Sequence, residues 1–199
     1  MKYKKHRQYR LKDFDYSVNG EYFITICIAD RKKYFGKIID EKINLSPIGR
    51  IVERIWNHIP NKFVNVKLDN YQIMPDHFHG IIILKDDQRH LINQMPTCKS
   101  GIKNNPMEMN RISLGSIIRW FKGRVKYEAG KTNPDFKWQS RFYDRVIRDE
   151  KEFYFIREYI IDNPRNRGTG ILKNYFDYKL QEFDLHPVKQ VMSLQKNRK

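Results

Sequence analysis

The chain has 199 residues and a formal net charge of +16 at neutral pH. A content of 40% hydrophobic and 14% aromatic residues excludes a chain that is disordered throughout and indicates one domain with a buried core. No apolar run approaches the ~20 residues of a membrane span, and the two cysteines, Cys27 and Cys98, make neither a disulfide framework nor a zinc cluster, so we expect a reduced, cytoplasmic protein without a membrane partner.

The positive charge is concentrated near the two ends of the chain. Residues 1–14 contain six Lys/Arg and one Asp, and residues 187–199 contain four Lys/Arg and no acidic residue, so these segments hold +9 of the net charge. A basic surface attracts polyanions, which favours nucleic acid as the partner, although solvated tails without a specific role are an alternative. We expect a single domain over 1–199, with a core of about 20–167, a basic N-terminal arm and a basic C-terminal tail.

The first half of the chain predicts strands around one helix. Residues 22–28 are β-branched and aromatic, as in a strand that is buried on both faces. A Ser-Pro pair is typical of a helix start, and the apolar residues that follow at helical spacing predict a helix over 47–60. Two further strands are predicted at about 64–74 and at 77–84.

The next part of the chain predicts a loop and a second helix. Residues 86–112 are polar and contain two prolines, which is typical of a long loop. Ser113 begins a helix whose apolar residues face the core. The basic side chains of Arg119, Lys122 and Lys126 fall on another side of this helix, and this stripe is our candidate DNA contact.

A fourth strand and a third helix complete the predicted order. Residues 138–147 predict the strand, and Asp149 with Glu152 resembles a capping box at the start of the helix. We expect this helix to end at Asn163, before Pro164. The order β-α-β-β-α-β is the split βαβ pattern, so the predicted fold class is α+β: a ferredoxin-like antiparallel sheet with packed helices and an added C-terminal helix that carries a tyrosine, Tyr159.

Two histidines flank one hydrophobic residue at the start of the third predicted strand. Alternate side chains share a face of a strand, so His77 and His79 project from the same side and can bind one divalent metal ion. Pro75 indicates that a strand begins here, at a margin of the sheet where ligands can approach. Two ordinary polar residues at a strand start are the alternative interpretation.

Tyr159 and Asn163 lie four residues apart on the last predicted helix and therefore on one face. Phe153, Ile156 and Ile160 define the core side of that helix. Tyr159 lies beside them, so its phenol can be presented at the sheet surface, and the amide oxygen of Asn163 can supply a third metal ligand. A packing tyrosine with a wet hydroxyl and a helix C-terminal asparagine are the alternatives.

Three segments, in this order and spacing, resemble the signature of the REP-associated tyrosine transposases: YQIMPDHFHGIIIL, WQSRFYDRVIRDEKEF and REYIIDNP. The resemblance extends from about Tyr22 to Arg167, which is most of the chain. These proteins belong with the single-tyrosine insertion-sequence transposases in the His-hydrophobic-His (HUH) endonuclease superfamily. One departure is Arg145, where the family often has His, and we assign Arg145 no catalytic role.

The resemblance implies a metal-dependent endonuclease and strand transferase that acts on single-stranded or hairpin DNA. The sequence leaves open whether it acts as a monomer or a homodimer. It implies that His77 and His79 bind Mg²⁺ or Mn²⁺, that Asn163 completes the metal site and that Tyr159 is the nucleophile. It also implies a 5′-phosphotyrosine intermediate with a free 3′-hydroxyl on the leaving strand. Two imidazoles suit zinc or nickel as well, so the identity of the metal stays open.

Two other classes of protein are compatible with the sequence. A ferredoxin-like sheet is also the architecture of RNA-binding modules that stack bases on sheet aromatics, which would make the chain a non-enzymatic single-stranded nucleic-acid-binding protein. No RNP-like aromatic pattern is visible on a predicted strand, which disfavours this class. A domesticated or decayed transposase is the third class, and the intact His, His, Tyr and Asn argue against chemical decay without distinguishing a mobile element from a host enzyme.

Overall fold

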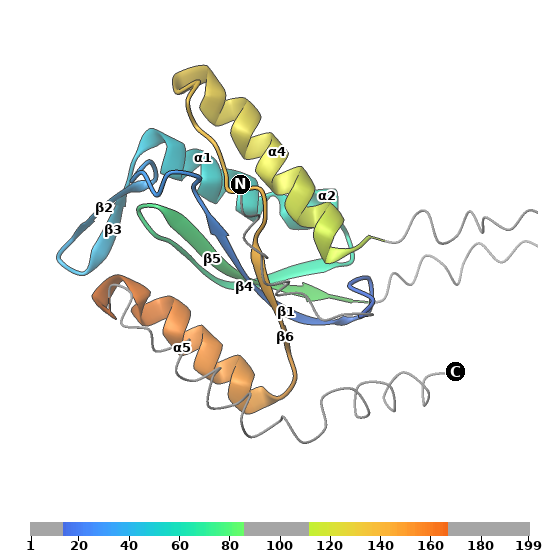
Figure 1. Cartoon of the computed structure of the whole chain (residues 1–199). Coiled ribbons are helices and arrows are strands. Elements are labelled where there is room, and N and C mark those ends of the chain that lie inside the picture. Colours follow the sequence, from blue (N-terminus) through green and yellow to red (C-terminus); the bar gives the residue numbers. More distant parts are fainter. Residues whose placement is uncertain (1–13, 86–111, 167–199) are drawn as a thin grey trace, which may run out of the picture. The chain divides into compact units, whose positions relative to one another are not determined.

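A four-stranded antiparallel sheet forms the centre of the computed structural model, which describes residues 14–85 and 112–166 (Figure 1). Cys98 and the predicted C-terminal tail lie outside these residues. The predicted N-terminal arm and the predicted long loop also lie outside them, apart from one residue of each. The single domain over 1–199 therefore stays a prediction. Within the described part of the chain, no helix is long and apolar enough to cross a membrane.

The sheet has the strand order of a ferredoxin-like fold. Its strands are β1 (Gly20–Cys27), β4 (Val66–Ile73), β5 (His77–Leu84) and β6 (Tyr143–Ile147). Their order in space is β4-β5-β1-β6, and every neighbouring pair is antiparallel. The helices that connect them complete the split βαβ arrangement, and the α+β fold class predicted from the sequence is confirmed.

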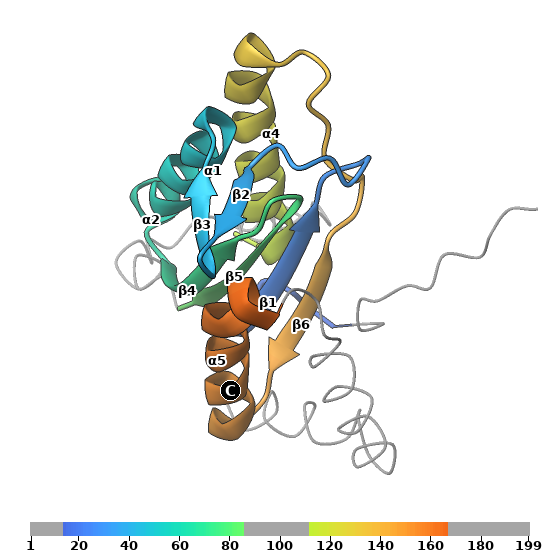
Figure 2. The ribbon, with the colours of Figure 1, turned by 90° about the vertical axis from the view of Figure 1, so that its left-hand side faces the viewer.

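Helices cover both faces of the sheet. Helices α1 (Pro47–Asn57) and α4 (Leu114–Thr132) lie on one face, and α5 (Glu150–Asn166) lies on the other (Figures 1 and 2). This arrangement explains why consecutive residues of β1, from Tyr22 to Ile24, are all fully buried. A strand with an apolar layer on each side cannot show the alternation of a half-exposed strand.

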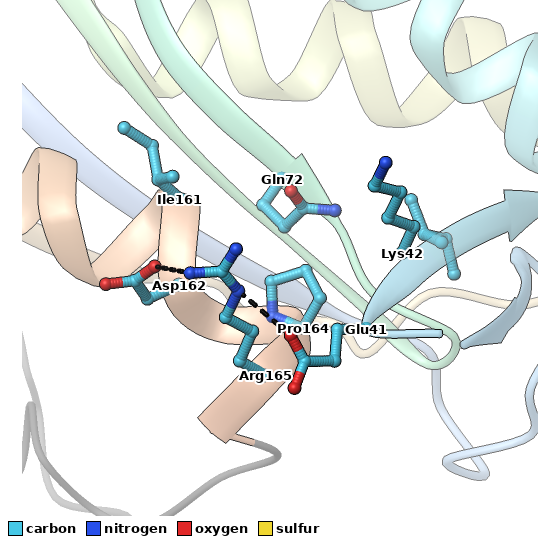
Figure 3. A pocket seen from close by; sticks show the side chains of 8 residues that line it. Glu41, Lys42, Gln72, Ile161, Asp162, Pro164 and Arg165 are labelled. Carbon is cyan, nitrogen blue, oxygen red and sulfur yellow. Dashed lines mark ion pairs between the residues drawn. The ribbon is translucent and has the colours of Figure 1, made fainter. Parts of the chain in front are cut away.

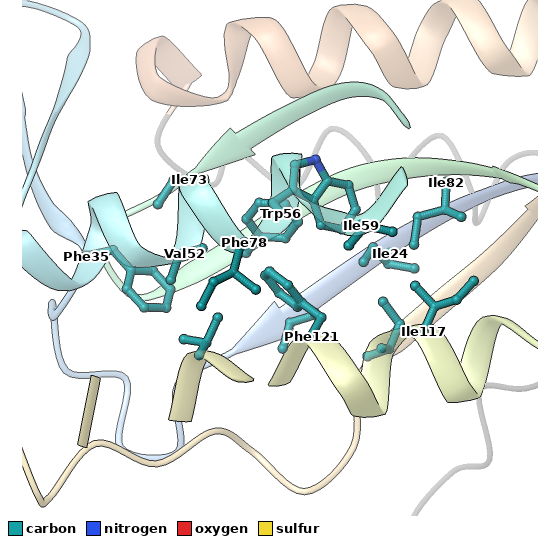
Figure 4. Close-up of a cluster of buried hydrophobic side chains, with 14 of the residues drawn as sticks. Ile24, Phe35, Val52, Trp56, Ile59, Ile73, Phe78, Ile82, Ile117 and Phe121 are labelled. Atoms are coloured by element: carbon teal, nitrogen blue, oxygen red, sulfur yellow. The ribbon is translucent and has the colours of Figure 1, made fainter. Parts of the chain in front are cut away.

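The main core lies between the sheet and the pair α1 and α4 (Figure 4). The Trp56 ring packs against Phe78 of β5, with ring centroids 4.6 Å apart, and against Phe121 of α4 at 5.5 Å. Gly80 of β5 leaves the space for this tryptophan, because a Cβ at position 80 would lie 2.6 Å from Trp56 Cζ2. The apolar residues predicted for the core side of α4 are all buried.

The first helix begins as predicted and ends earlier. Ser46 is the N-cap of α1, and its Oγ accepts a hydrogen bond from the backbone N–H of Gly49 at 3.0 Å. The predicted helix over 47–60 is divided into α1 and a four-residue helix α2 (Ile59–Lys62). Pro60 is the physical reason, because it has no N–H to donate to the carbonyl of Trp56 and its ring crowds that turn.

The strand predicted over 138–147 is shorter than expected, since β6 begins only at Tyr143. Trp138 forms an isolated bridge to Ile28, and the backbone N–H of Gln139 donates to the carbonyl of Cys27 at 2.9 Å. The residues between Gln139 and β6 are irregular. Lys122 of α4 binds this irregular segment, donating from Nζ to the carbonyl oxygens of Gln139 at 2.6 Å and Ser140 at 3.2 Å. These carbonyls therefore need no strand partner.

The last helix begins as predicted and continues past its predicted end. Asp149 Oδ1 accepts from the backbone N–H of Glu152 at 2.8 Å, and the Glu152 carboxylate accepts from the backbone N–H of Arg148 at 3.0 Å. The predicted end at Asn163 is wrong, because α5 continues to Asn166 with Pro164 inside it. Pro164 is buried, and packing of its ring outweighs the loss of one hydrogen bond in the final turn.

A small hairpin between β1 and α1 was not predicted from the sequence. Its strands are β2 (Gly36–Ile39) and β3 (Lys42–Leu45). Asp40 and Glu41 form the connecting turn with φ angles of 48° and 60°. Such turns favour Asn-Gly or Asp-Gly, so a pair without glycine, between two very short strands, has no clear signal in the sequence.

Candidate active site

The two histidines of the predicted metal site project from one face of β5, toward the layer formed by α5. Their ring centroids lie 4.7 Å apart. His79 is 4% exposed, whereas His77, at the first position of the strand, is only partly buried. The alternation of side chains along a strand, which predicted this pair, is what brings the two rings together.

Each histidine is held by a hydrogen bond to its Nδ1 atom. His77 Nδ1 lies 2.6 Å from Asp76 Oδ1, and His79 Nδ1 lies 2.8 Å from Thr25 Oγ1. Thr25 is the direct partner of His79 in the β1–β5 register. With the proton on Nδ1, each ring donates to its oxygen partner and presents the lone pair of Nε2, as metal-binding histidines do.

Tyr159 approaches the histidines from α5. Its hydroxyl oxygen lies 3.4 Å from His79 Nε2, and the two ring centroids are 5.4 Å apart. Phe23 of β1 supports both rings, stacking on His79 with centroids at 5.6 Å and meeting the Tyr159 ring edge-on at 6.3 Å. Asn163 is 3% exposed, and its side chain forms a hydrogen bond with the Tyr159 hydroxyl. The four predicted residues therefore lie in one site.

Burial determines the protonation of this site. Burial is the largest cause that holds the pKa of His79 well below its ordinary value, and the nearby His77 lowers it further. The imidazole of His79 is therefore neutral near pH 7, which is the state that binds metals. Burial also raises the pKa of Tyr159, and the hydrogen bond from Asn163 opposes that rise. Without a bound metal ion, the Tyr159 side chain is therefore protonated near neutral pH.

The donor atoms of this site fit a divalent ion. Two Nε2 atoms on one strand face and the amide oxygen of Asn163 make a mixed nitrogen and oxygen set. Metal–nitrogen bonds are about 2 Å long, and rings 4.7 Å apart can both reach one ion. No cluster of three His, Cys, Asp or Glu side chains that could hold a metal occurs in residues 14–85 and 112–166, and Asn163 as the third ligand stays a prediction.

The predicted DNA-contacting stripe lies on the other layer of the molecule. Helix α4 packs on the sheet face opposite to α5, so Arg119 and Lys126, both exposed, are separated from Tyr159 by the sheet (Figure 1). Lys122 is half-buried and donates to backbone carbonyls, and burial lowers the pKa of its ammonium group. The structure does not bring these three residues to the tyrosine site.

Sequence reasoning missed the residues that hold the histidines. Asp76 had a signal that could have been used, because it directly precedes His77. Thr25 had none, since only the register of β1 against β5 places it opposite His79. Arg145, the departure from the family pattern, pairs with Glu152, which is 3% exposed, and so contributes to the packing of α5 on β6.

Comparison with known proteins places the chain in a family. It is 37% identical to an uncharacterized protein of Haemophilus influenzae over 159 residues, which cover 79% of this chain and 87% of that protein. It is 26% identical to a protein of the same organism named as a candidate REP-associated tyrosine transposase, over 77% of this chain and 75% of that protein. No family model matches the sequence.

A solved structure has the same fold. The structure of a REP-associated tyrosine transposase bound to a REP hairpin aligns with a TM-score of 0.55 and 18% identity, over 82% of this chain and 75% of that chain. At 18% identity, this likeness shows that the two chains share a fold. The chain belongs to one family with the uncharacterized Haemophilus influenzae protein, and it is similar in sequence to the candidate REP-associated tyrosine transposase and in fold to the solved one.

Proposed function

We propose that this protein is a metal-dependent endonuclease that nicks and rejoins single-stranded DNA through Tyr159. The observation that carries the proposal is the placement of the Tyr159 hydroxyl 3.4 Å from His79 Nε2, in a site shared with His77 and Asn163. These residues come from two elements, β5 and α5, and Tyr159 and His79 lie 80 positions apart in the chain. A nucleophilic hydroxyl beside two imidazoles that can bind a metal ion is an arrangement suited to phosphoryl transfer.

The chain's own residues have distinct tasks in this reaction. The Tyr159 oxygen attacks the phosphorus and forms a phosphotyrosine bond, the bond to the leaving 3′ oxygen breaks, and the proton that the phenol gives up balances the proton that this 3′ oxygen takes up. Asp76 and Thr25 orient the two imidazoles through hydrogen bonds. Phe23 stacks on the His79 ring and meets the Tyr159 ring edge-on, and these contacts orient both rings. A bound Mg²⁺ or Mn²⁺ ion supplies charge neutralisation at a nonbridging phosphate oxygen.

The proposed substrate is hairpin DNA with a single-stranded flank. The similarly folded transposase was solved with a REP hairpin, and a net charge of +16 favours a polyanionic ligand. The 5′-phosphotyrosine intermediate retains the energy of the phosphodiester, which allows the strand to be rejoined. Strand transfer is therefore part of the proposed activity, with the protein acting as a transposase or as a domesticated form of one.

The competing interpretation is a non-enzymatic binder of single-stranded nucleic acid. Modules of that class leave one face of the sheet open so that bases can stack on its aromatic residues. Here helices lie on both faces (Figure 2). The aromatic Phe23 is fully buried and packs against the rings of His79 and Tyr159. This arrangement favours the enzyme.

The decisive experiment is incubation of the full chain with hairpin oligonucleotides and Mn²⁺, followed by a denaturing gel. We expect a covalent protein–DNA adduct, absent when EDTA replaces the metal. Changing both His77 and His79 to Ala should abolish the adduct and leave most hairpin binding intact, because binding depends chiefly on backbone phosphates. Wild-type-like cleavage by the double variant would refute the metal assignment.

A further inference from the structure

A cavity of about 320 Å³ lies beside the candidate active site, between the β2–β3 hairpin, β4 and the end of α5 (Figure 3). Its volume is at the lower end of the range for small-ligand sites, which begins at about 300 Å³. The proposed reaction assigns no task to it.

Two elements connect this cavity to the tyrosine site. Gln72, in the cavity wall, is the direct partner of His79 in the β4–β5 register. Directly opposed side chains in an antiparallel pair have their Cβ atoms about 5 Å apart. On α5, Asp162 and Pro164 of the wall flank Asn163 in sequence. The cavity wall therefore includes the direct strand partner of His79 and both sequence neighbours of Asn163.

The charged side chains of the cavity balance one another. Arg165 pairs with Glu41 at 3.2 Å and with Asp162 at 3.6 Å (Figure 3). Lys42 adds a second positive charge, so two cations face two carboxylates. A phosphate group needs an excess of positive charge, and this cavity does not offer one. Its ligand should be neutral.

The remaining wall suits a flat, polar-edged ring. Ile43, Ile161 and Pro164 supply apolar surface, and Gln72 supplies an amide. The carboxylates are hydrogen-bond acceptors, which match the amino groups on the edges of cytosine and adenine, whereas thymine has no such group. A nucleobase that has left its stack is read by contacts of this kind.

One of these carboxylates belongs to Glu41, whose backbone adopts an energetically unfavourable conformation in the turn of the β2–β3 hairpin. Glu41 has a φ of 60°, in the left-handed region that glycine favours, and such residues cost of order 1–3 kcal/mol each. The ion pair with Arg165 ties this turn to α5, the helix of Tyr159. The turn thus places an acceptor at the cavity wall.

We propose that this cavity binds one unpaired nucleobase next to the phosphodiester that Tyr159 attacks, and that it prefers a base with an exocyclic amino group. The inference rests on the proposed function, and it adds a site that reads sequence at the cleaved strand.

The test uses the full chain and hairpin oligonucleotides in which each position of the single-stranded flank is cytosine, thymine or abasic in turn. Fluorescence anisotropy measures binding, and adduct formation with Mn²⁺ measures cleavage. At one position beside the cleaved bond, thymine or an abasic site should weaken wild-type binding about tenfold relative to cytosine. The other positions should show smaller effects.

Two cavity variants and one matched control separate the cavity from general binding. Ile161→Trp fills the cavity and should abolish the preference at that position, whereas Val64→Trp, at a residue equally exposed at 60% and outside the cavity wall, should retain it. Glu41→Gln keeps the size of the side chain and should reduce the preference for cytosine over thymine. Thermal melting confirms that each variant is folded.

The outcomes distinguish the cavity from the enzyme. Adduct formation that is indifferent to the base at every flank position, or a preference that survives in Ile161→Trp, would overturn the cavity proposal and leave the proposed function standing. A wild-type chain that neither binds nor joins any hairpin would overturn the proposed function, and this inference with it.

Discussion

At Tyr159 the proposed chemistry depends on one hydroxyl group. Tyr159→Phe removes that oxygen and keeps the ring against Phe23, so the free energy of unfolding should change by only about 1 kcal/mol. The covalent adduct should fall below detection, because no other group in the site forms a phosphotyrosine bond. Hairpin affinity and Mn²⁺ binding should survive, and anisotropy and calorimetry measure them separately.

The controls for this variant are two other tyrosines. Tyr154→Phe changes a residue of α5 that is 60% exposed, and Tyr143→Phe changes a partly buried neighbour of Phe23 on β6. Both variants should still form the adduct. Mass spectrometry that maps the DNA to either residue would show that the site has been assigned to the wrong tyrosine.

Thr25 is the residue whose role only the structure revealed. Thr25→Val keeps the shape of the side chain and removes the oxygen that lies 2.8 Å from His79 Nδ1. Loss of such an outer partner weakens metal affinity by about 10–100-fold, so the midpoint of a Mn²⁺ titration of adduct formation should rise by that factor. Thr25→Ser should restore it. A purely structural role would lower the melting temperature and leave the midpoint unchanged.

At the scale of elements, alanine substitutions at two glycines should change the free energy of unfolding in opposite directions. Gly80→Ala in β5 forces a Cβ to within 2.6 Å of Trp56 Cζ2, and overpacking of this kind costs about 1–3 kcal/mol. Gly123→Ala in α4 meets no atom within 4 Å and should stabilise the helix by about 0.5–1 kcal/mol.

Thermal unfolding measures both effects. Each kcal/mol should move the melting temperature by about 2–4 °C in a protein of this size, downward for Gly80→Ala and upward for Gly123→Ala. Equal shifts of the same sign would contradict the packing described here for the face of the sheet that α1 and α4 cover.

Helix α5 shows how one element combines separate tasks. It places Tyr159 against His79, buries Asn163 and continues past Pro164 to form a wall of the cavity. The Arg145–Glu152 pair and the capping contacts of Asp149 fix its first turn on β6. The position of Tyr159 therefore depends on contacts at both ends of the helix.

At the scale of the whole molecule, the net charge predicts how binding responds to salt. The logarithm of the binding constant should fall against the logarithm of salt concentration with a slope near −0.7 per phosphate contacted on a single strand. Deleting residues 1–12, which contain six Lys/Arg and no acid, should flatten this slope. Replacing those six residues by Gln keeps the length and should have the same effect. A salt-insensitive affinity would argue against a nucleic-acid partner.

The sequence by itself determined the local structure of this protein. Ser46 and Ser113 mark helix starts because a side-chain oxygen satisfies N–H groups within the same turn, and the spacing of apolar residues defines the core side of α4. The strand period predicted that His77 and His79 share a face, and the helix period predicted the same for Tyr159 and Asn163. These inferences succeed because they depend on neighbours in the chain.

Only the tertiary structure decided how these pairs meet. The distance between Tyr159 and His79 depends on the packing of α5 against a sheet whose strands are far apart in sequence. Thr25 reaches His79 through strand register, Lys122 is turned inward by an irregular segment, and Pro164 stays within a helix because its ring is buried. Each of these features is a long-range contact that overrides a local preference, and no local pattern encodes it.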